Sequence, residues 1–248
     1  MLGLMAPALT AGVMVSALHV PLGQEVLRRG IIFIDLAIAQ IAALGVVIGK
    51  TLLHVEEGWE VFIPAIGFAL GGSFLFAWLE KRVPEHQEAL IGCAFVLAAS
   101  LILILLANDP HGGEAVEGLL AGQILWVDWM QIGQTALVYA ASLTAWFLLP
   151  HRRRVLFYGL FPVVVTLSVQ LVGVYLVFAS LIMPALGAAR FRGRHQLAGG
   201  YFISFSALGL GLLFSVVADL PAGPTLVCAL AALSAAGGLL PERKMTCK

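Results

Sequence analysis

The chain has 248 residues, of which 60% are hydrophobic and only 11% are charged, and its mean hydropathy is +0.99. About a quarter of the residues of a soluble domain are charged, and disordered chains are poor in apolar side chains, so both classes are excluded. The 14 basic and 14 acidic residues cancel, so nothing in the composition suggests nucleic acid as a partner. The composition predicts a protein that is embedded in lipid.

Four apolar stretches in the first half of the chain are each long enough to cross a membrane. About 20 residues of helix cover the hydrocarbon core, and these stretches are residues 2–24, 31–49, 61–79 and 89–107. The second stretch is interrupted by the polar residues Asp35 and Gln40. We expect four transmembrane helices here.

Two apolar stretches of the second half, residues 118–149 and 155–189, are too long for a single span. The first favours a short outer or re-entrant segment followed by a span from about Trp129. The second favours a span that turns near the outer face and returns as short broken helices ending near Met183 and Pro184. Broken helices at membrane depth are typical of transporters.

Two further stretches, residues 197–218 and 220–241, complete the pattern. The predicted fold class is all-α: a polytopic membrane protein of about eight to nine transmembrane helices with short broken helices. The longest polar loop, residues 108–117, is too short for a soluble domain, so residues 1–248 are predicted to form one transmembrane domain.

The basic residues predict the orientation, because cytoplasmic loops carry an excess of Lys and Arg. The N-terminus is placed outside and the C-terminus in the cytoplasm, with an odd number of crossings. Of the 14 basic residues, 13 then lie inside and only Lys50 lies outside. Glu25 falls near the inner surface and is expected to pair with an arginine.

No motif of an enzyme is present. The sequence has no phosphate-binding G-x-x-x-x-G-K-[ST] loop, no His-Glu-x-x-His and no Gly-x-Ser-x-Gly. Any ATP hydrolysis that drives this protein must therefore be carried out by a separate chain.

Three polar side chains of the first two spans, His19, Asp35 and Gln40, are candidates for a cation pathway. An ionisable group inside the bilayer is costly, and imidazole nitrogen and carboxylate oxygen suit zinc and manganese. The alternative is structural. Asp35 would then pair with Arg28 or Arg29, Gln40 would bond to a neighbouring helix, and His19 would be a packed, hydrogen-bonded residue.

The polar loop 108–117 places His111 and Glu114 on the predicted outer face. A loop with His, Asp and Glu can accept a divalent cation or dock a delivery protein. An ordinary solvated turn is the alternative, and short acidic loops are usually of that kind.

The order of several short motifs resembles the permease subunit of metal-ion ABC importers, the family that takes up zinc, manganese or iron. The motifs extend over nearly the whole chain: Pro-Leu-Gly at 21–23, Val-Leu-Arg-Arg at 26–29, Leu-Ala-Gly-Gln-Ile-Leu at 120–125, Leu-Ile-Met-Pro-Ala at 181–185 and Asp-Leu-Pro-Ala-Gly-Pro-Thr at 219–225. The last two are the most specific. Each motif is weak alone, but their order and spacing together are specific.

The second span departs from the pattern of that family. The family usually has an aspartate and a histidine four residues apart there, in the metal path. Here the alignment puts Gln40 at the histidine position and Asp35 one residue early. Glutamine is a poorer zinc ligand than imidazole, so the site is either weaker or remodelled, with His19 as a candidate recruit.

The inner segment before the 172–173 Val-Gly pair is a second departure. In the family it is longer and contains the coupling helix that docks on the ATPase, whereas here only residues 151–161 are available. The resemblance makes Arg152, Arg153, Arg154 and Tyr158 the expected docking residues. A positive-inside anchor without a partner is the alternative.

The resemblance implies a permease subunit of an ATP-driven ABC importer for divalent metal ions, with zinc favoured over manganese or iron. It implies no enzymatic activity and no tightly bound cofactor, because Zn²⁺ would be the transported substrate. The expected partners are a cytoplasmic ABC ATPase, an extracytoplasmic metal-binding protein and a second permease subunit in a homodimer. The expected location is the bacterial inner membrane. The two departures leave an alternative open, an ATPase-independent secondary transporter or channel derived from such a permease.

Overall fold

Nine α-helices make up most of the computed structural model, which describes residues 2–52, 59–106 and 124–239. The helices are α1 (Leu2–Arg29), α2 (Ile34–Leu52), α3 (Phe62–Arg82), α4 (Gln87–Leu105), α6 (Trp129–Leu148), α7 (Arg153–Val172), α8 (Val174–Gly187), α9 (Arg194–Ala218) and α10 (Ala222–Leu239). No strand occurs in these residues. The all-α prediction is confirmed.

Six segments of the described chain are helical, long and apolar enough to cross a membrane. They are Met5–Arg29, Ile34–Thr51, Phe62–Arg82, Pro84–Leu105, Pro150–Val172 and Arg194–Ala218. Helices α8 and α10 are apolar but shorter. Helix α8 is a short helix of the kind that the long stretch 155–189 predicts, whereas α10 is shorter than the full span expected for residues 220–241.

The long stretch 155–189 breaks where a glycine permits it. Helix α7 ends at Val172, and α8 begins at Val174. Gly173 between them has φ of +82°, a conformation that only glycine adopts without strain. The predicted turn inside this stretch is confirmed.

The start of α6 is fixed by a capping box. The side chain of Asp128 accepts a hydrogen bond from the backbone N–H of Gln131 at 2.7 Å, and the side chain of Gln131 accepts one from the N–H of Asp128 at 3.3 Å. Two N–H groups that the first turn would leave unpaired are thereby satisfied. The helix begins at Trp129, as the sequence predicts.

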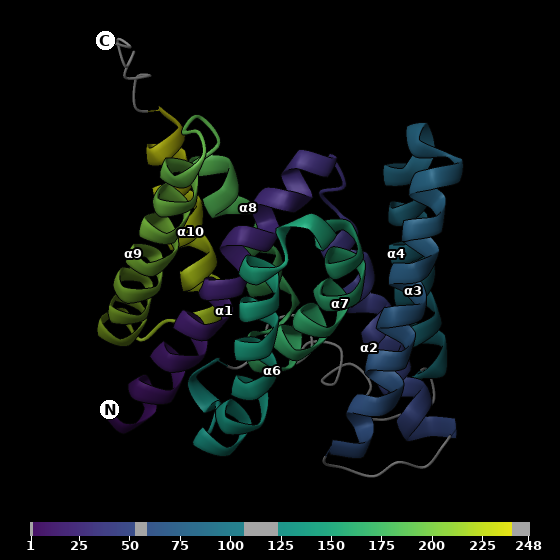
Figure 1. Cartoon of the computed structure of the whole chain (residues 1–248). Helices are drawn as coiled ribbons and strands as arrows, with labels where there is room; N and C mark the ends of the chain where they lie inside the picture. Colours follow the sequence, from purple (N-terminus) through teal and green to yellow (C-terminus); the bar gives the residue numbers. More distant parts are fainter. Residues whose placement is uncertain (1, 53–58, 107–123, 240–248) are drawn as a thin grey trace, which may run out of the picture.

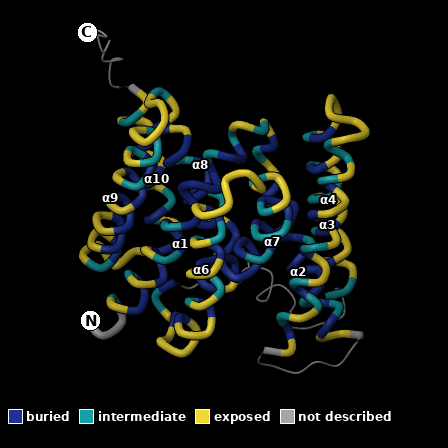
Figure 2. Tube along the Cα trace, viewed as in Figure 1, coloured by how far each residue is buried: buried dark blue, intermediate teal, exposed yellow. Residues whose placement is uncertain are grey.

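The helices form two groups with α1, α6 and α7 between them (Figure 1). On one side α2 packs against α3 and α4, and on the other side α8, α9 and α10 pack together. Helix α1 contacts α8 and α9, and α3 contacts α7. Figure 2 shows buried residues concentrated in the centre, whereas α3, α4 and α9 carry exposed outer faces. Those faces hold large apolar side chains such as Phe74, Leu97 and Phe214, as a lipid-facing surface requires.

Ion pairs bring three helix ends together at one end of the bundle. The last turn of α1, the last turn of α3 and the first turn of α7 meet there, joined by the pairs Arg29–Glu80 at 3.3 Å and Arg154–Glu80 at 2.8 Å. We call this the arginine end. The start of α1 lies at the opposite end of the bundle from the end of α10 (Figure 1).

Candidate functional site

His19 lies at the centre of a polar network that joins four helices. The residue is fully buried, with 0% of its surface exposed. Its Nδ1 is 2.7 Å from Oγ of Ser180 on α8, and its Nε2 is 2.8 Å from Oγ of Ser168 on α7. The hydroxyl of Tyr139 on α6 is hydrogen-bonded to the same oxygen of Ser168. The network is therefore shared by α1, α6, α7 and α8.

Both serines are also bonded to their own helices. The hydroxyl of Ser168 is 2.7 Å from the carbonyl oxygen of Val164, and that of Ser180 is 3.0 Å from the carbonyl oxygen of Val177. With both ring nitrogens of His19 occupied, a metal ion can reach the ring only after a serine moves away. In this conformation His19 is the packed, hydrogen-bonded residue of the structural interpretation.

A close approach of α1 and α8 places His19 beside Ser180. A Cβ built on Gly23, one helical turn after His19, would lie 1.9 Å from the carbonyl oxygen of Leu181. No side chain fits there, so only glycine allows this contact. The motifs at 21–23 and 181–185 therefore meet in one packing contact.

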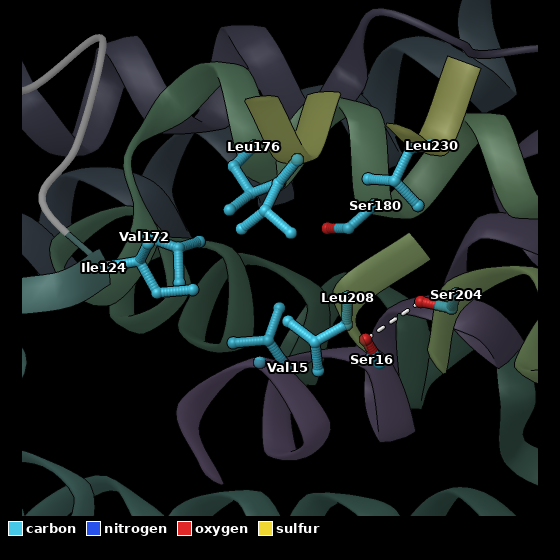
Figure 3. A pocket seen from close by; sticks show the side chains of 11 residues that line it. Val15, Ser16, Ile124, Val172, Leu176, Ser180, Ser204, Leu208 and Leu230 are labelled. Carbon is cyan, nitrogen blue, oxygen red and sulfur yellow. Dashed lines mark hydrogen bonds between the residues drawn. The ribbon is translucent and has the colours of Figure 1, made fainter. Parts of the chain in front are cut away.

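A small cavity borders the network (Figure 3). Its volume is about 20 Å³, enough for about one water molecule. Its walls come mainly from α1, α8, α9 and α10 and are apolar except for three serines. Ser204 donates a hydrogen bond to Ser16 at 2.9 Å, and Ser180 links the cavity to His19.

Asp35 is a buried carboxylate without a countercharge. It lies in the first turn of α2 with 1% of its surface exposed, and neither of its oxygens has a hydrogen-bond partner in the described part of the chain. The hypothesis that it pairs with Arg28 or Arg29 is wrong. Both arginines bind Glu25, at 3.3 Å and 2.9 Å. The prediction that Glu25 pairs with an arginine is confirmed.

No cluster of metal-ligating side chains surrounds Asp35 in the part of the chain that the structure describes. Gln40, further along α2, is buried with 7% exposed. Across residues 2–52, 59–106 and 124–239, no group of three or more His, Cys, Asp or Glu side chains is arranged to hold a metal ion. His111 and Glu114 lie outside the described residues.

Glu80 on α3 holds the arginine end together. Its carboxylate accepts hydrogen bonds from Arg29 at 3.3 Å, from Arg154 at 2.8 Å and from the hydroxyl of Tyr158 at 3.1 Å. Gln87 of α4 donates to the Tyr158 hydroxyl at 3.4 Å. Sequence reasoning missed Glu80, although an acidic residue directly before Lys-Arg at a predicted inner helix end was a signal.

The four expected docking residues have different surroundings. Tyr158 is 4% exposed and faces the Glu80 network rather than the surface. Arg153 is half-buried, with its guanidinium 5.8 Å from the centre of the Trp146 ring, a cation–π contact. Arg152 and Arg154 are exposed. Of the four, only these two have exposed side chains, and Arg154 is also paired with Glu80.

Three residues of the central network were also missed. Ser168, Ser180 and Tyr139 are single hydroxyls within apolar stretches, and nothing local distinguishes them from other serines and tyrosines. Ser168 and Ser180 lie 149 and 161 residues from His19 in the sequence. Tyr139 and Ser168 are 29 residues apart. Only the fold brings these residues into contact.

Comparison with known proteins agrees with this architecture. The "High-affinity zinc uptake system membrane protein ZnuB" of Haemophilus influenzae is 25% identical over 249 residues, which is 92% of this chain and 94% of that protein. The solved structure of PsaBC from Streptococcus pneumoniae in complex with Fab matches with a TM-score of 0.77 at 21% identity, over 95% of this chain and 91% of that chain. An inward-facing structure assigned to a metal-chelate type ABC transporter matches with a TM-score of 0.62 at 16% identity, over 94% and 84%.

The ABC 3 transport family profile matches residues 1–157 and 148–237. The matched residues include all of α1–α9 and nearly all of α10. The resemblance that the short motifs indicate is thus confirmed over almost the full length, and the chain belongs to the ABC 3 transport family.

Proposed function

We propose that the chain is the membrane-spanning permease subunit of an ATP-driven importer of divalent metal ions, with zinc as the substrate. The observation that carries the proposal is the match to a zinc uptake membrane protein over 92% of this chain and 94% of that protein. The match extends over nearly all of both chains. The agreement in fold with PsaBC supports the same membrane-spanning architecture.

The described polar groups suit the transport of a cation. Asp35 supplies an unpartnered carboxylate within the bundle, and His19 supplies ring nitrogens. Carboxylate oxygen and imidazole nitrogen are ligands for zinc. Ser168 and Ser180 are hydrogen-bonded to both ring nitrogens of His19 in this conformation. A metal ion would therefore reach the ring only in another state of the transport cycle. Alternating access provides such a state, because the helix groups on either side of α1 can move relative to each other.

The proposed complex contains a second copy of the chain, a cytoplasmic ABC ATPase and an external metal-binding protein. The arginine end would face the cytoplasm of a bacterial inner-membrane protein, with the N-terminus outside, in accordance with the distribution of Lys and Arg. Arg152 and Arg154, both exposed at this end, are the described candidates for the ATPase contact.

Uptake of labelled zinc into metal-starved cells tests the proposal. The cells carry the chain with its partner subunits or lack the chain alone, and manganese and iron are added as competitors. Uptake that requires the chain and stops on ATP depletion is the expected result. The order of the competitors then ranks the metals.

Two other outcomes contradict the proposal. Uptake that survives ATP depletion while the ion gradients are intact supports the secondary transporter. The inward placement of Tyr158, which reduces the surface for an ATPase, favours that second candidate. No uptake of any of the three metals overturns metal transport as the function.

A further inference from the structure

The connection between α8 and α9 is strongly basic. Residues 188–195, which we call the basic turn, contain three arginines and a histidine: Arg190, Arg192, Arg194 and His195. The sequence has no acidic residue between Asp128 and Asp219. None of the three arginines forms an ion pair within the described residues, whereas at the arginine end Glu25 and Glu80 bind three arginines. The charge of the basic turn is therefore not neutralised by the described chain.

The basic turn lies beside the last turns of α1. Helix α9 begins at Arg194, and Gly200 follows about two turns later. A Cβ built on Gly200 would lie 2.8 Å from the Val20 side chain and 3.6 Å from Nε2 of Gln24. The basic turn is thus at the same end of the bundle as the arginine end. With that end facing the cytoplasm, the basic turn lies at the inner surface of the membrane.

Arg190 is a partly buried charge without a counterion in the described residues. Its Nε is buried and has no hydrogen-bond partner there. Its guanidinium lies 5.3 Å from the centre of the Phe191 ring, and this cation–π contact holds the side chain in place without neutralising it. Because burial of a charge is costly unless the charge is paired, Arg190 requires an anion.

The start of α9 adds to the positive potential of the basic turn. No side chain caps this helix, and its first turn contains no acidic residue. The N–H groups at a helix start carry partial positive charge and bind phosphate. Gly193 precedes the helix, and a Cβ built there would meet no atom within 4 Å. An anion can therefore approach the start of α9 freely.

Exposed apolar side chains adjoin the basic turn. Leu186, at the end of α8, is 52% exposed, and Phe191 within the turn is 40% exposed. Phe202 of α9 is 73% exposed. It follows His195 by two helical turns, so it lies on the same face and about 10 Å deeper in the membrane. A ligand with a phosphate and acyl chains fits both parts of this surface, whereas an acidic protein surface fits only the arginines.

We propose that the basic turn binds the phosphate of an anionic phospholipid in the inner leaflet. Guanidinium groups bind phosphate through paired, charge-assisted hydrogen bonds. Basic pockets at the cytoplasmic ends of transmembrane helices are typical sites for acidic headgroups. The acyl chains lie against the apolar side chains below the turn. The inference goes beyond the proposed function, because lipid binding at this turn does not require metal transport.

The test is equilibrium binding of radiolabelled phosphatidylglycerol to the purified full-length chain in detergent. Arg192→Gln/Arg194→Gln removes two exposed charges from the basic turn and is expected to weaken binding by at least about tenfold. The matched control is Lys81→Gln/Arg82→Gln, which removes two exposed charges from the last turn of α3 at the same end of the bundle. The control is expected to bind the lipid as the wild type does.

Competition identifies the ligand. Unlabelled phosphatidylglycerol is expected to displace the label, whereas the same concentration of zwitterionic phosphatidylcholine or of inorganic phosphate is not. Equal displacement by phosphatidylcholine overturns a site for anionic lipid. Equal displacement by inorganic phosphate identifies a site for a free anion and overturns the lipid as the ligand.

Wild-type binding of phosphatidylglycerol in Arg192→Gln/Arg194→Gln overturns the proposal. If that variant binds the lipid normally but no longer co-purifies with an ATPase subunit, the basic turn is a protein contact instead. Should the double variant fail to elute as folded protein, Arg192→Gln replaces it. A loss of about fivefold is then expected, and unchanged binding counts against the site. Since the lipid is bound without any metal, failure of this proposal leaves the transport function intact, and failure of metal uptake leaves this site intact.

Discussion

At the scale of single residues, the interior contains two kinds of buried polar group. His19 is fully satisfied by Ser168 and Ser180, whereas Asp35 has no partner in the described chain. A satisfied group contributes to stability, but an unsatisfied one opposes it. Substitutions at the two places should therefore change stability in different directions.

Ser168→Ala removes the partner of both His19 and Tyr139. Because two buried groups lose a hydrogen bond, the free energy of unfolding is expected to fall by about 1–3 kcal/mol. Thermal unfolding of the purified protein in detergent measures the change. Ser100→Ala is the control, since Ser100 is exposed and bonds only to the carbonyl of Val96 in its own helix. Equal effects of the two substitutions would contradict the central role of Ser168.

Asp35→Asn is expected to lower zinc uptake by at least about tenfold without a loss of stability. The carboxylate has no partner to lose, and the amide does not carry a buried charge. Uptake is normalised to the amount of protein in the membrane, and thermal unfolding is measured in parallel. Glu25→Gln serves for comparison, because it breaks two ion pairs and should destabilise. Normal uptake by Asp35→Asn would place Asp35 outside the pathway.

At the scale of helices, two local contacts join helices of the bundle, a close approach at a glycine and a set of hydrogen bonds to one acidic side chain. Gly23 lets α1 approach the backbone of α8. Glu80 ties α3 to α1 and α7. Each contact depends on a single residue, so each can be tested by one substitution.

Gly23→Ala should force α1 and α8 apart. The added methyl group would overlap the carbonyl of Leu181, and overpacking of this kind costs about 1–3 kcal/mol. The amount of folded protein and its thermal unfolding report the effect. Gly133→Ala in α6 is the control, because a Cβ there meets no atom within 4 Å. That variant is expected to be neutral or slightly more stable. A wild-type-like Gly23→Ala would show that the two helices are not in close contact.

Glu80→Gln should loosen the arginine end. Arg29 loses one of its two acidic partners, and Arg154 loses the partner at 2.8 Å. A decrease of about 2 kcal/mol in the free energy of unfolding is expected, since hydrogen bonds to charged groups are lost. Glu85→Gln is the control, because Glu85 lies in the turn Pro84–His86 and is exposed. An unchanged unfolding temperature in low salt would mean that these ion pairs do not stabilise the fold. Many exposed ion pairs have no measurable effect on stability.

At the scale of the whole molecule, the sequence predicts the helices better than their contacts. Lipid requires every backbone group to be paired within its own segment, so apolar length alone locates the spans. The start at Trp129 and the break near Gly173 follow from local signals, a capping residue and a glycine.

Contacts between distant residues could not be predicted in this way. The pairing of Glu25 with Arg28 and Arg29 depends on spacings of three and four residues along one helix, and the sequence reveals such spacings. The alternative in which Asp35 pairs with Arg28 or Arg29 is wrong, because which carboxylate the two arginines bind depends on where α2 lies relative to α1. The contacts of Ser168 and Ser180 with His19 could not be predicted from the sequence either, since only the folded bundle brings these residues together.

The bonds of Ser168 and Ser180 to their own helices have a consequence for motion. If His19 moves away, each serine hydroxyl can still donate to a carbonyl of its own helix, so no serine is stranded in the apolar interior. The imidazole alone then lacks partners, and an arriving cation can supply one. The two hydroxyls therefore keep a hydrogen-bond acceptor in their own helices whether or not the ring is present.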